Sequence, residues 1–338
     1  MRPGNEPLFR KYTMTFSTRA IEIPYEEIDR TSETFLLSPG STETQAESQR
    51  LGSSIDRVGV LSPPLLMQRG DGSYQVVTGW HRIAAHYARF GNKPILCLVL
   101  TANTRAEDCL VLALEDILWQ RQPTAVEIAI FFSKTARQQG GRPIIERYLS
   151  ILNLPANRKT IDRYLSLLQL EEPIIMAVHD GQVNERLAFE LAALSIRDRL
   201  SIFEVVDRLH LSVSNQKKLY TGVAELAGRR KTSFMDVLAD DEAMEILNHS
   251  SANIPQKTAK LMAWLERERL PRLHEAEKDF QQLARELRLP EAMRLEHALS
   301  FERDSLTLSL TFANAEHLKR HLPQLKKLLS STAPPTAI

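Results

Sequence analysis

Apolar side chains recur at helical spacing almost without interruption from residue 106 to residue 250, and strand signals are few there. A period of three to four residues places such side chains on one face of a helix, whereas a half-buried strand would need strict alternation. We therefore expect an all-α middle domain, placed at residues 136–250. The 338 residues of the chain exceed what one core usually organises, so further domains are expected before and after it.

The residues before the helical region mix strand and helix signals. Residues 1–18 are polar and unpatterned, which predicts a flexible arm, and structure is expected to begin near Ala20. The pattern predicts strands at 21–23, 65–68, 74–77 and 94–100, helices at 51–58 and 80–90, and a loop at 38–48. Residues 19–135 are therefore expected to form an α+β domain.

The last part of the chain combines helices with a small sheet. A charged helix from about residue 255 is interrupted at Pro271, and strands are expected at about 295–301 and 306–312 before a helix through Leu318, Leu325 and Leu328. These elements are too small to form an independent core comfortably. We expect residues 255–330 to be a small α+β self-association module in which a second copy covers the apolar face.

Composition narrows the classes of function. The net charge of +1 excludes a globally basic nucleic-acid coat but permits a local basic patch. Cys97 and Cys109 lack the spacing of a disulfide framework or a zinc site, so no metal site is assigned. No signal-peptide pattern is recognised at the N-terminus, and no apolar run approaches the roughly 18 residues of a membrane span. A cytoplasmic protein with no membrane partner is therefore expected.

A strand-to-helix turn at Gly79 is a candidate phosphate-binding site. The glycine lets N–H groups at the helix start point toward an anion, and His81 and Arg82 would add donors. Such a turn also needs glycine for steric reasons when no ligand is present. A purely structural turn therefore remains the alternative.

Residues 144–168 predict a helix-turn-helix. Ile144–Leu152 forms one helix in this interpretation, and Asn157 caps a second helix that runs from Arg158 to Leu168 with Ile161, Leu165 and Leu168 facing inward. A recognition helix contacts bases with its first residues, and nearby cations neutralise phosphates. The candidate DNA-binding residues are Arg142, Arg147, Asn157, Arg158, Lys159, Thr160 and Arg163, with Lys134 and Arg137 as further phosphate contacts. The alternative is an ordinary helical hairpin with a basic face.

Three segments in a fixed order resemble the ParB/sulfiredoxin domain: Gly59-Val60-Leu61-Ser62-Pro63-Pro64, Tyr74-Gln75-Val76-Val77-Thr78-Gly79-Trp80-His81-Arg82 and Lys93-Pro94-Ile95. That family pairs a Gly-x-x-x-Pro segment with a Gly-x-x-Arg turn at its nucleotide pocket, and a Glu-Asn-x-x-Arg motif handles nucleotide and metal. The resemblance therefore implies an α+β ParB/sulfiredoxin-like domain that binds CTP or another nucleotide with Mg²⁺. The residues implied are Gly59, Pro63, Gly79, His81, Arg82, Glu115 and Asp116.

Departures from the family pattern limit the chemistry. Trp80 stands where sulfiredoxins carry their cysteine, and because Trp cannot act as a thiolate nucleophile, that activity is not expected. Two arginines typical of the ParB turn are missing, and the Glu115-Asp116 stretch lacks the Asn and has a different spacing to Arg121. These changes argue against nucleotide hydrolysis and leave nucleotide binding open. In the alternative interpretation, Glu115 and Asp116 lie on a solvated helix face, and no catalytic residue is assigned.

The helix-turn-helix carries a second part of the resemblance. Asn157–Leu170 and the following Glu172–Asn184 are similar to the ParB recognition helix and to its Leu-x-Leu-Pro and Asp-Gly-x-Leu segments. This resemblance implies a sequence-specific DNA-binding protein of chromosome or plasmid partition or nucleoid organisation. Its implied partners are double-stranded DNA, a second copy of the chain and a ParA-like ATPase, and its implied place is the nucleoid.

Two other functions remain open. A DNA-binding transcriptional regulator would use the same recognition helix at dispersed sites. An enzyme on the same N-terminal fold, a nucleotide hydrolase or a phosphoryl transferase, would use Glu115 or Asp116 to hold Mg²⁺ beside phosphates at the Gly79–Arg82 turn.

Overall fold

The computed structural model describes residues 16–40, 45–287, 293–297, 305–312, 314–316, 318–320 and 322–323. They belong to two compact units: residues up to Tyr220 with Ser233–Leu238, and Thr221–Thr232 with the residues from Ala239 onward. The predicted fold class is confirmed, because an α+β region is followed by a long run of helices and then by a small two-stranded sheet. The domain boundaries drawn from the sequence stay a prediction. Within the described ranges, no helix is both long and apolar enough to cross a bilayer.

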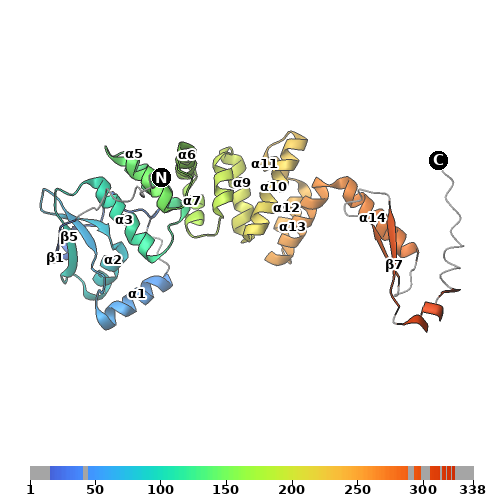
Figure 1. The fold of residues 1–338 in the computed structure, drawn as a ribbon, viewed down its shortest axis with the longest axis horizontal. Coiled ribbons are helices and arrows are strands. Elements are labelled where there is room, and N and C mark those ends of the chain that lie inside the picture. The colour runs from blue at the N-terminus through green and yellow to red at the C-terminus, as the bar shows by residue number, and fades with distance from the viewer. Residues whose placement is uncertain are drawn as a thin grey trace, which may run out of the picture. The chain divides into compact units, whose positions relative to one another are not determined.

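A five-stranded mixed sheet opens the first unit (Figure 1). Its strands are β1 (Thr18–Ile23), β2 (Ile28–Asp29), β3 (Leu65–Gln68), β4 (Tyr74–Thr78) and β5 (Ile95–Leu100), in the order β1-β5-β3-β4-β2. The β1–β5 and β3–β4 pairs are antiparallel, whereas β3–β5 and β2–β4 are parallel. The hairpin between β3 and β4 turns at Gly72, whose φ of 88° suits glycine. Strand β1 starts at Thr18, the last residue of the predicted arm, and residues 1–15 of that arm lie outside the described residues.

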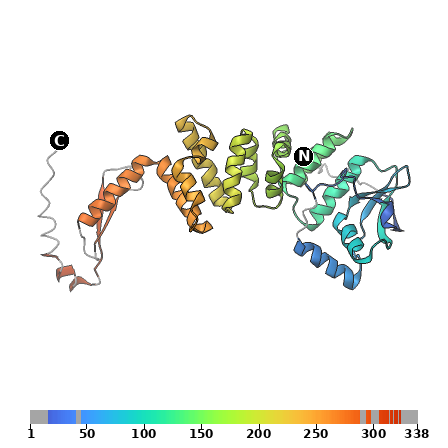
Figure 2. The ribbon, with the colours of Figure 1, turned by 180° about the vertical axis from the view of Figure 1, so that it is seen from behind.

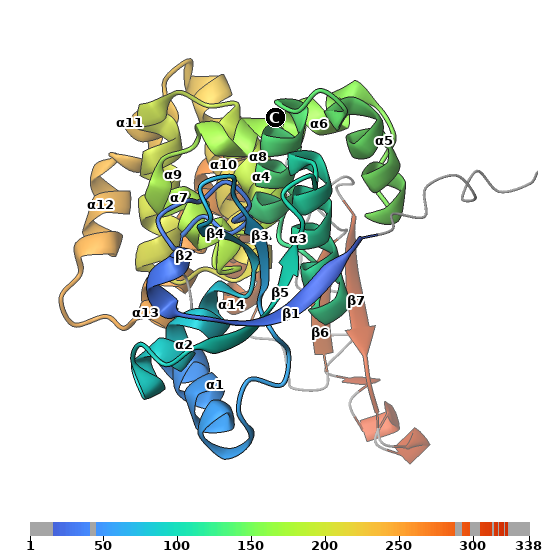
Figure 3. The same ribbon diagram turned by 90° about the vertical axis from the view of Figure 1, so that its left-hand side faces the viewer.

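Three helices complete this α+β region. Helices α1 (Gln45–Val58) and α2 (Trp80–Phe90) pack against each other, and α3 (Ala106–Gln120) packs against β4 (Figure 3). The helix predicted at 51–58 starts earlier, at Gln45, so the expected loop is shortened by the residues 45–48. The buried core of the region consists of Ile23, Tyr25, Ile28, Leu66, Val76, Ile83, Ile95, Cys97 and Val99.

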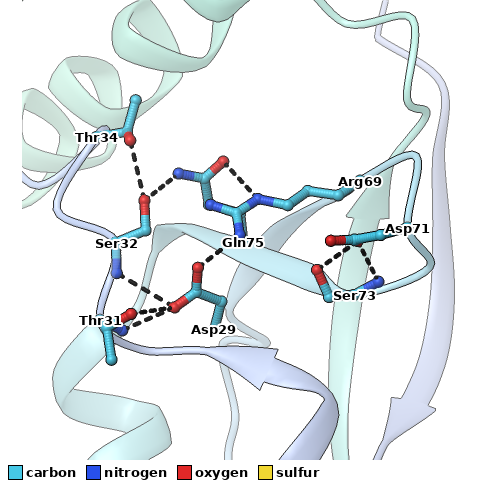
Figure 4. Close-up of polar contacts among 8 residues, drawn as sticks. All are labelled: Asp29, Thr31, Ser32, Thr34, Arg69, Asp71, Ser73 and Gln75. Atoms are coloured by element: carbon cyan, nitrogen blue, oxygen red, sulfur yellow. Dashed lines mark hydrogen bonds and ion pairs between the residues drawn. The ribbon is translucent and has the colours of Figure 1, made fainter.

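A polar network joins β2, the β3–β4 hairpin and the segment after β2 (Figure 4). Arg69 donates to Asp29 over 2.6 Å, and the buried Gln75 donates to Ser32 over 2.5 Å. Hydrogen bonds from Thr31, more than the arginine, hold the pKa of Asp29 below its ordinary value. These hydrogen bonds join the edge strand β2 and the segment after it to the β3–β4 hairpin.

The helical part of the first unit begins with α4, on which the next three helices pack. Its elements are α4 (Ala125–Ala136), α5 (Gly141–Ile151), α6 (Arg158–Ser166), the 3-10 turn η3 (Leu167–Gln169), α7 (Glu172–His179), α8 (Glu185–Ala192), α9 (Ile196–Arg208), α10 (Val213–Arg230) and α11 (Phe234–Leu238), and α10 runs on into the second unit. A capping box at Thr124 and Glu127 begins α4, and Phe131 and Phe132 are fully buried at its middle. Helices α5, α6 and α7 all pack on α4, which confirms the predicted all-helical region.

The second unit contains α12 (Asp241–Asn248), α13 (Ile254–Arg269), α14 (Pro271–Glu286), β6 (Met293–His297) and β7 (Leu306–Leu310), seen from behind in Figure 2. The predicted break at Pro271 is confirmed, since α14 starts there with proline at its first position. Strands β6 and β7 pair antiparallel, with Leu295 opposite Leu308. The first predicted strand starts earlier, at Met293, and its residues 298–301 lie outside the described residues, as do Leu325 and Leu328.

Candidate nucleic-acid interface and phosphate turn

Helices α5 and α6 are the two helices for which the sequence predicts a helix-turn-helix, and both pack on α4. The chain reverses after α5 with Asn153 in the left-handed region (φ 55°), a conformation that asparagine tolerates better than most residues. The side chain of Asn157 then accepts a hydrogen bond from the Thr160 N–H over 2.9 Å, which begins α6. The predicted N-cap is therefore confirmed, although α6 ends at Ser166 and η3 continues in its place.

The inward face of α6 includes residues beyond the predicted ones. Ile161, Leu165 and Leu168 are partly buried, and Tyr164 and Leu167 are buried. Tyr164 packs against the helix below it. Its ring meets Phe132 of α4 edge-on with centroids 5.8 Å apart.

Tyr164 also joins α6 to α8. Its ring lies edge-on to Phe189 at 5.3 Å, and its hydroxyl donates to Glu185 over 2.8 Å. Burial is the main cause that raises the pKa of Tyr164, and the bonded carboxylate raises it further, so the phenol stays protonated. Helix α6 is thus anchored on its inner side by an aromatic cluster.

The outer face of α6 is cationic. Arg158 is 91% exposed, and Lys159 and Arg163 are exposed as well. Arg158 pairs with Asp162 over 3.6 Å, four residues along the same helix. Such an exposed pair contributes little to stability, so the guanidinium can exchange this partner for a phosphate.

The remaining candidates on this surface differ in their availability. Arg142 is 88% exposed and pairs with Glu146 over 3.1 Å, and Arg147 is exposed. The hydroxyl of Thr160 donates to Asn157 over 3.1 Å, so these two side chains serve the helix cap. Lys134 is not available in the way the sequence predicted, because its ammonium donates to the carbonyls of Glu33 and Leu36. Burial lowers the pKa of Lys134.

The turn at Gly79 is a left-handed strand-to-helix junction, with φ 93° at the cap of α2. A Cβ at this position would lie 2.9 Å from Pro64 Cα, so glycine is required by both the dihedral angle and the space. The two sequence segments of the resemblance therefore meet in space. Gly59 ends α1 with φ 70°, and its N–H donates to Ile55.

Arg82 binds within the protein at this junction. Its guanidinium donates to the carbonyl and the hydroxyl of Ser62 over 2.8 and 2.7 Å and reaches the Pro63 carbonyl at 3.4 Å. The other end of the fork forms an ion pair with Asp116 over 3.2 Å, and the side chain is only 16% exposed. We call the set of Arg82, Ser62 and Asp116 the Arg82 clasp. It joins the 59–64 segment, α2 and α3.

The acidic candidates have partners as well. Glu115 accepts a hydrogen bond from the hydroxyl of Tyr148 on α5, and Asp116 belongs to the Arg82 clasp. Within the described part of the chain, no group of three His, Cys, Asp or Glu side chains could hold a metal ion. In this arrangement Arg82 and Asp116 bind each other, and Glu115 binds Tyr148. Nucleotide binding by Gly59, Pro63, His81 and their neighbours stays a prediction.

Trp80 has a packing role in this structure. It lies against the sheet core, and its buried indole N–H has no hydrogen-bond partner. Burial without a partner costs free energy, which the apolar contacts of the ring must offset. This position therefore contributes to the core.

Comparisons with known proteins found similar solved structures at low sequence identity. No family model and no curated protein matches the sequence. ParB from Caulobacter crescentus is similar in two solved forms. The C-terminally truncated protein complexed with CTP-gamma-S has 21% identity and a TM-score of 0.26, covering 53% of this chain and 94% of the other. The form complexed to the centromeric parS site has 19% identity and a TM-score of 0.32, covering 58% and 96%. A Pnob8-like ParB-N domain has 15% identity and a TM-score of 0.38, covering 73% and 93%. The structural neighbours are thus ParB chromosome-partitioning proteins and a ParB-N domain.

Several residues that build the candidate interface escaped the sequence reasoning. Tyr148, Tyr164, Phe189 and Ser62 all contact a predicted site residue or anchor its helix. A tyrosine at the middle of α6 was a usable signal, because a buried aromatic on a short basic helix marks its packing face. Ser62 gave no signal, since its contact with Arg82 spans 20 residues.

Proposed function

We propose that this chain is a ParB-type protein that binds double-stranded DNA through α5 and α6. The observation that carries the proposal is the first turn of α6. This turn is capped by Asn157 and presents Arg158 and Lys159 to solvent, while Tyr164 holds the opposite face in the core. A helix with this division can enter a groove of the duplex without unfolding its support.

The order of sequence segments that resembles ParB supports partition or nucleoid organisation as the setting. In that setting the chain would associate with the nucleoid and with a ParA-like ATPase. A transcriptional regulator would have the same interface, so the distribution of DNA sites has to decide between the two. Genomic fragments enriched on the purified chain should contain one motif clustered near the replication origin. Motifs scattered over promoters would assign the chain to gene regulation.

The small sheet supports pairing with a second copy. Met293, Leu295 and His297 lie on one face of β6, opposite Leu310, Leu308 and Leu306 of β7. Leu306 is 48% and Leu308 38% exposed, although both lie on this predominantly apolar face. A homodimer would cover these leucines and would present two recognition helices to a palindromic site. Sedimentation of the intact chain beside a Leu306→Glu/Leu308→Glu variant tests this pairing, which a monomeric wild-type protein at micromolar concentration would contradict.

The main test removes the two exposed cations. We expect Arg158→Ala/Lys159→Ala to weaken binding to a duplex enriched by the wild-type chain by about 30-fold or more and to reduce the salt slope by about 2. The melting temperature should be unchanged, because both side chains are exposed. Arg89→Ala is the matched control, since Arg89 is an exposed arginine on α2. Duplex binding that ignores both salt and the double substitution would contradict the proposal.

A further inference from the structure

Phe189 on α8 supports a side chain of the recognition helix. The guanidinium carbon of Arg163 lies 4.0 Å from the centroid of the Phe189 ring. At this distance the cation is attracted by the electron-rich face of the ring. A guanidinium stacked on an aromatic ring keeps the N–H groups of its edge free to donate in its own plane.

Arg163 differs in this respect from the other arginines of the interface. Arg142 and Arg158 each have a carboxylate partner, Glu146 and Asp162. Among the described residues, no acidic side chain forms an ion pair or a hydrogen bond with the guanidinium of Arg163. The Phe189 ring therefore holds the guanidinium of Arg163 without using its N–H donors.

The stack is not needed to attach α6 to α8. Tyr164 already makes this attachment, through its edge-on contact with the same Phe189 ring and its hydrogen bond to Glu185. Arg163 also lies four residues after Lys159, so the two cations share one face of α6. Arg163 can thus contact a ligand on the same exposed face of α6 as Lys159.

We propose that Phe189 is a positioning residue that holds Arg163 as a preformed fork for a phosphate of the bound duplex. The proposal rests on the DNA-binding function proposed above and adds α8 to the interface. A long arginine side chain that is free in solution loses rotamer freedom on binding. The ring removes much of this loss in advance, so Phe189 strengthens the contact without touching DNA.

The experiment is a double-mutant cycle on the enriched duplex, with affinity, salt slope and melting temperature measured for each variant. Arg163→Ala should weaken binding about tenfold and reduce the salt slope by about 1. Phe189→Leu, which keeps an apolar side chain but removes the ring face, should weaken binding about threefold to fivefold. In the Arg163→Ala background it should have no further effect on affinity. Phe189→Tyr should restore wild-type affinity, because it keeps the ring.

Tyr164→Phe is the structural comparator, since it removes the bond to Glu185 and should lower the melting temperature with little effect on DNA affinity. Additive losses for Arg163→Ala and Phe189→Leu would overturn the coupling. Relaxed preference at one base pair with an unchanged salt slope would overturn the phosphate assignment. If Arg158→Ala/Lys159→Ala weakens binding but Phe189→Leu does not, this inference fails and the proposed function stands. If the wild-type chain enriches no duplex, the proposed function itself fails.

Discussion

The Gly79 turn and the α5–α6 pair both present arginines that the sequence marks as anion ligands, yet the two regions use them differently. Arg82 is 16% exposed and binds Ser62 and Asp116, so its fork holds three segments of the fold together. Arg158 is 91% exposed, and its single ion pair is a loose one on the helix surface. The same residue type is therefore a structural clasp in one region and a solvated, exchangeable cation in the other.

The difference lies in the number of partners each arginine already has. A guanidinium that makes several hydrogen bonds in a partly buried site must break them before it can bind a ligand. An exposed guanidinium with one carboxylate partner exchanges that partner for a phosphate at little cost. Substitutions in the first region should thus change stability, and substitutions in the second should change DNA affinity.

The largest effect is expected where α5 is set against α4. A Cβ at Gly141 would lie 1.8 Å from the Thr135 carbonyl oxygen, which is backbone and cannot move away alone. Gly141→Ala should therefore displace the start of α5 and lower the free energy of unfolding by about 2–3 kcal/mol, measured by urea denaturation. Since α5 carries Arg142 and Arg147 of the proposed interface, DNA affinity should fall as well.

Gly228→Ala is the matched control for this substitution. Gly228 lies in α10, and a Cβ there would meet nothing within 4 Å. The alanine should stabilise the helix by about 0.5–1 kcal/mol. A Gly141→Ala variant as stable as the wild type would show that α5 can shift on α4 without cost, which would contradict this prediction.

We expect the Arg82 clasp to contribute to the unfolding free energy. Arg82→Ala removes two hydrogen bonds to Ser62 and leaves Asp116 without its cation, so we expect a loss of about 2 kcal/mol in unfolding free energy. Arg89 lies on the same helix as Arg82 and forms an exposed ion pair with Asp56 of α1. Arg89→Ala should therefore lower the unfolding free energy by less than about 0.5 kcal/mol. The folded Arg82→Ala protein should bind the enriched duplex as the wild type does.

A nucleotide titration sharpens the comparison at the same residue. The predicted binding of CTP and Mg²⁺ at this turn requires the fork to leave Ser62 and Asp116, so calorimetry should give a weak affinity for the wild-type chain. Saturable binding that Arg82→Ala abolishes would show that the clasp opens for a phosphate. Arg82 would then belong with Arg158 among the exchangeable cations.

A smaller effect is expected from His179, an internally engaged group of the helical region. Its Nδ1 lies 3.0 Å from the Thr124 hydroxyl, and burial is the main cause that lowers the pKa of His179. The unfolded chain takes up the proton near pH 6.5, whereas the folded chain takes it up only at lower pH. Unfolding free energy should therefore fall as pH falls from about 7 toward the lowered folded-state pKa.

His179→Asn should flatten this dependence, because the amide can keep the contact with Thr124 and does not titrate. Burial also lowers the pKa of His86, so part of the slope should remain. Denaturation curves between about pH 7.5 and 5.5 measure both contributions. Identical slopes for the two proteins would mean that His179 does not titrate differently on folding.

The fold was largely accessible from sequence, because it depends on local signals. Asp71-Gly72 marks the β3–β4 turn, Asn157 marks the start of α6 and Pro271 marks the start of α14, and each acts within a few residues. The meeting of the 59–64 segment with the Gly79 turn came from a resemblance to a family and not from these local signals.

The partners of the site residues were not accessible in the same way. Arg82 and Asp116 are 34 residues apart, and Lys134 binds carbonyls about 100 residues earlier, so no helical or strand period reports these contacts. The burial of Tyr164 in the inward face of α6 was missed for a related reason. Counting aliphatic positions points to Ile161 and Leu165, whereas the aromatic rings of α4 and α8 pack on Tyr164. Local sequence predicts which helix or strand carries a side chain, whereas residues distant in the sequence determine which groups it contacts.

The smallest expected effect tests the carboxylate beside Arg158. Asp162→Asn removes the partner at 3.6 Å and one negative charge from the face that would meet DNA. The duplex affinity should rise about twofold to threefold at low salt, with the melting temperature nearly unchanged, because the exposed pair contributes little to stability. Asp56→Asn is the matched control, since it frees an exposed arginine on α2 by the same chemistry. Equal gains in both variants would mean that only net charge matters, whereas a gain confined to Asp162→Asn would locate the exchangeable cation on α6.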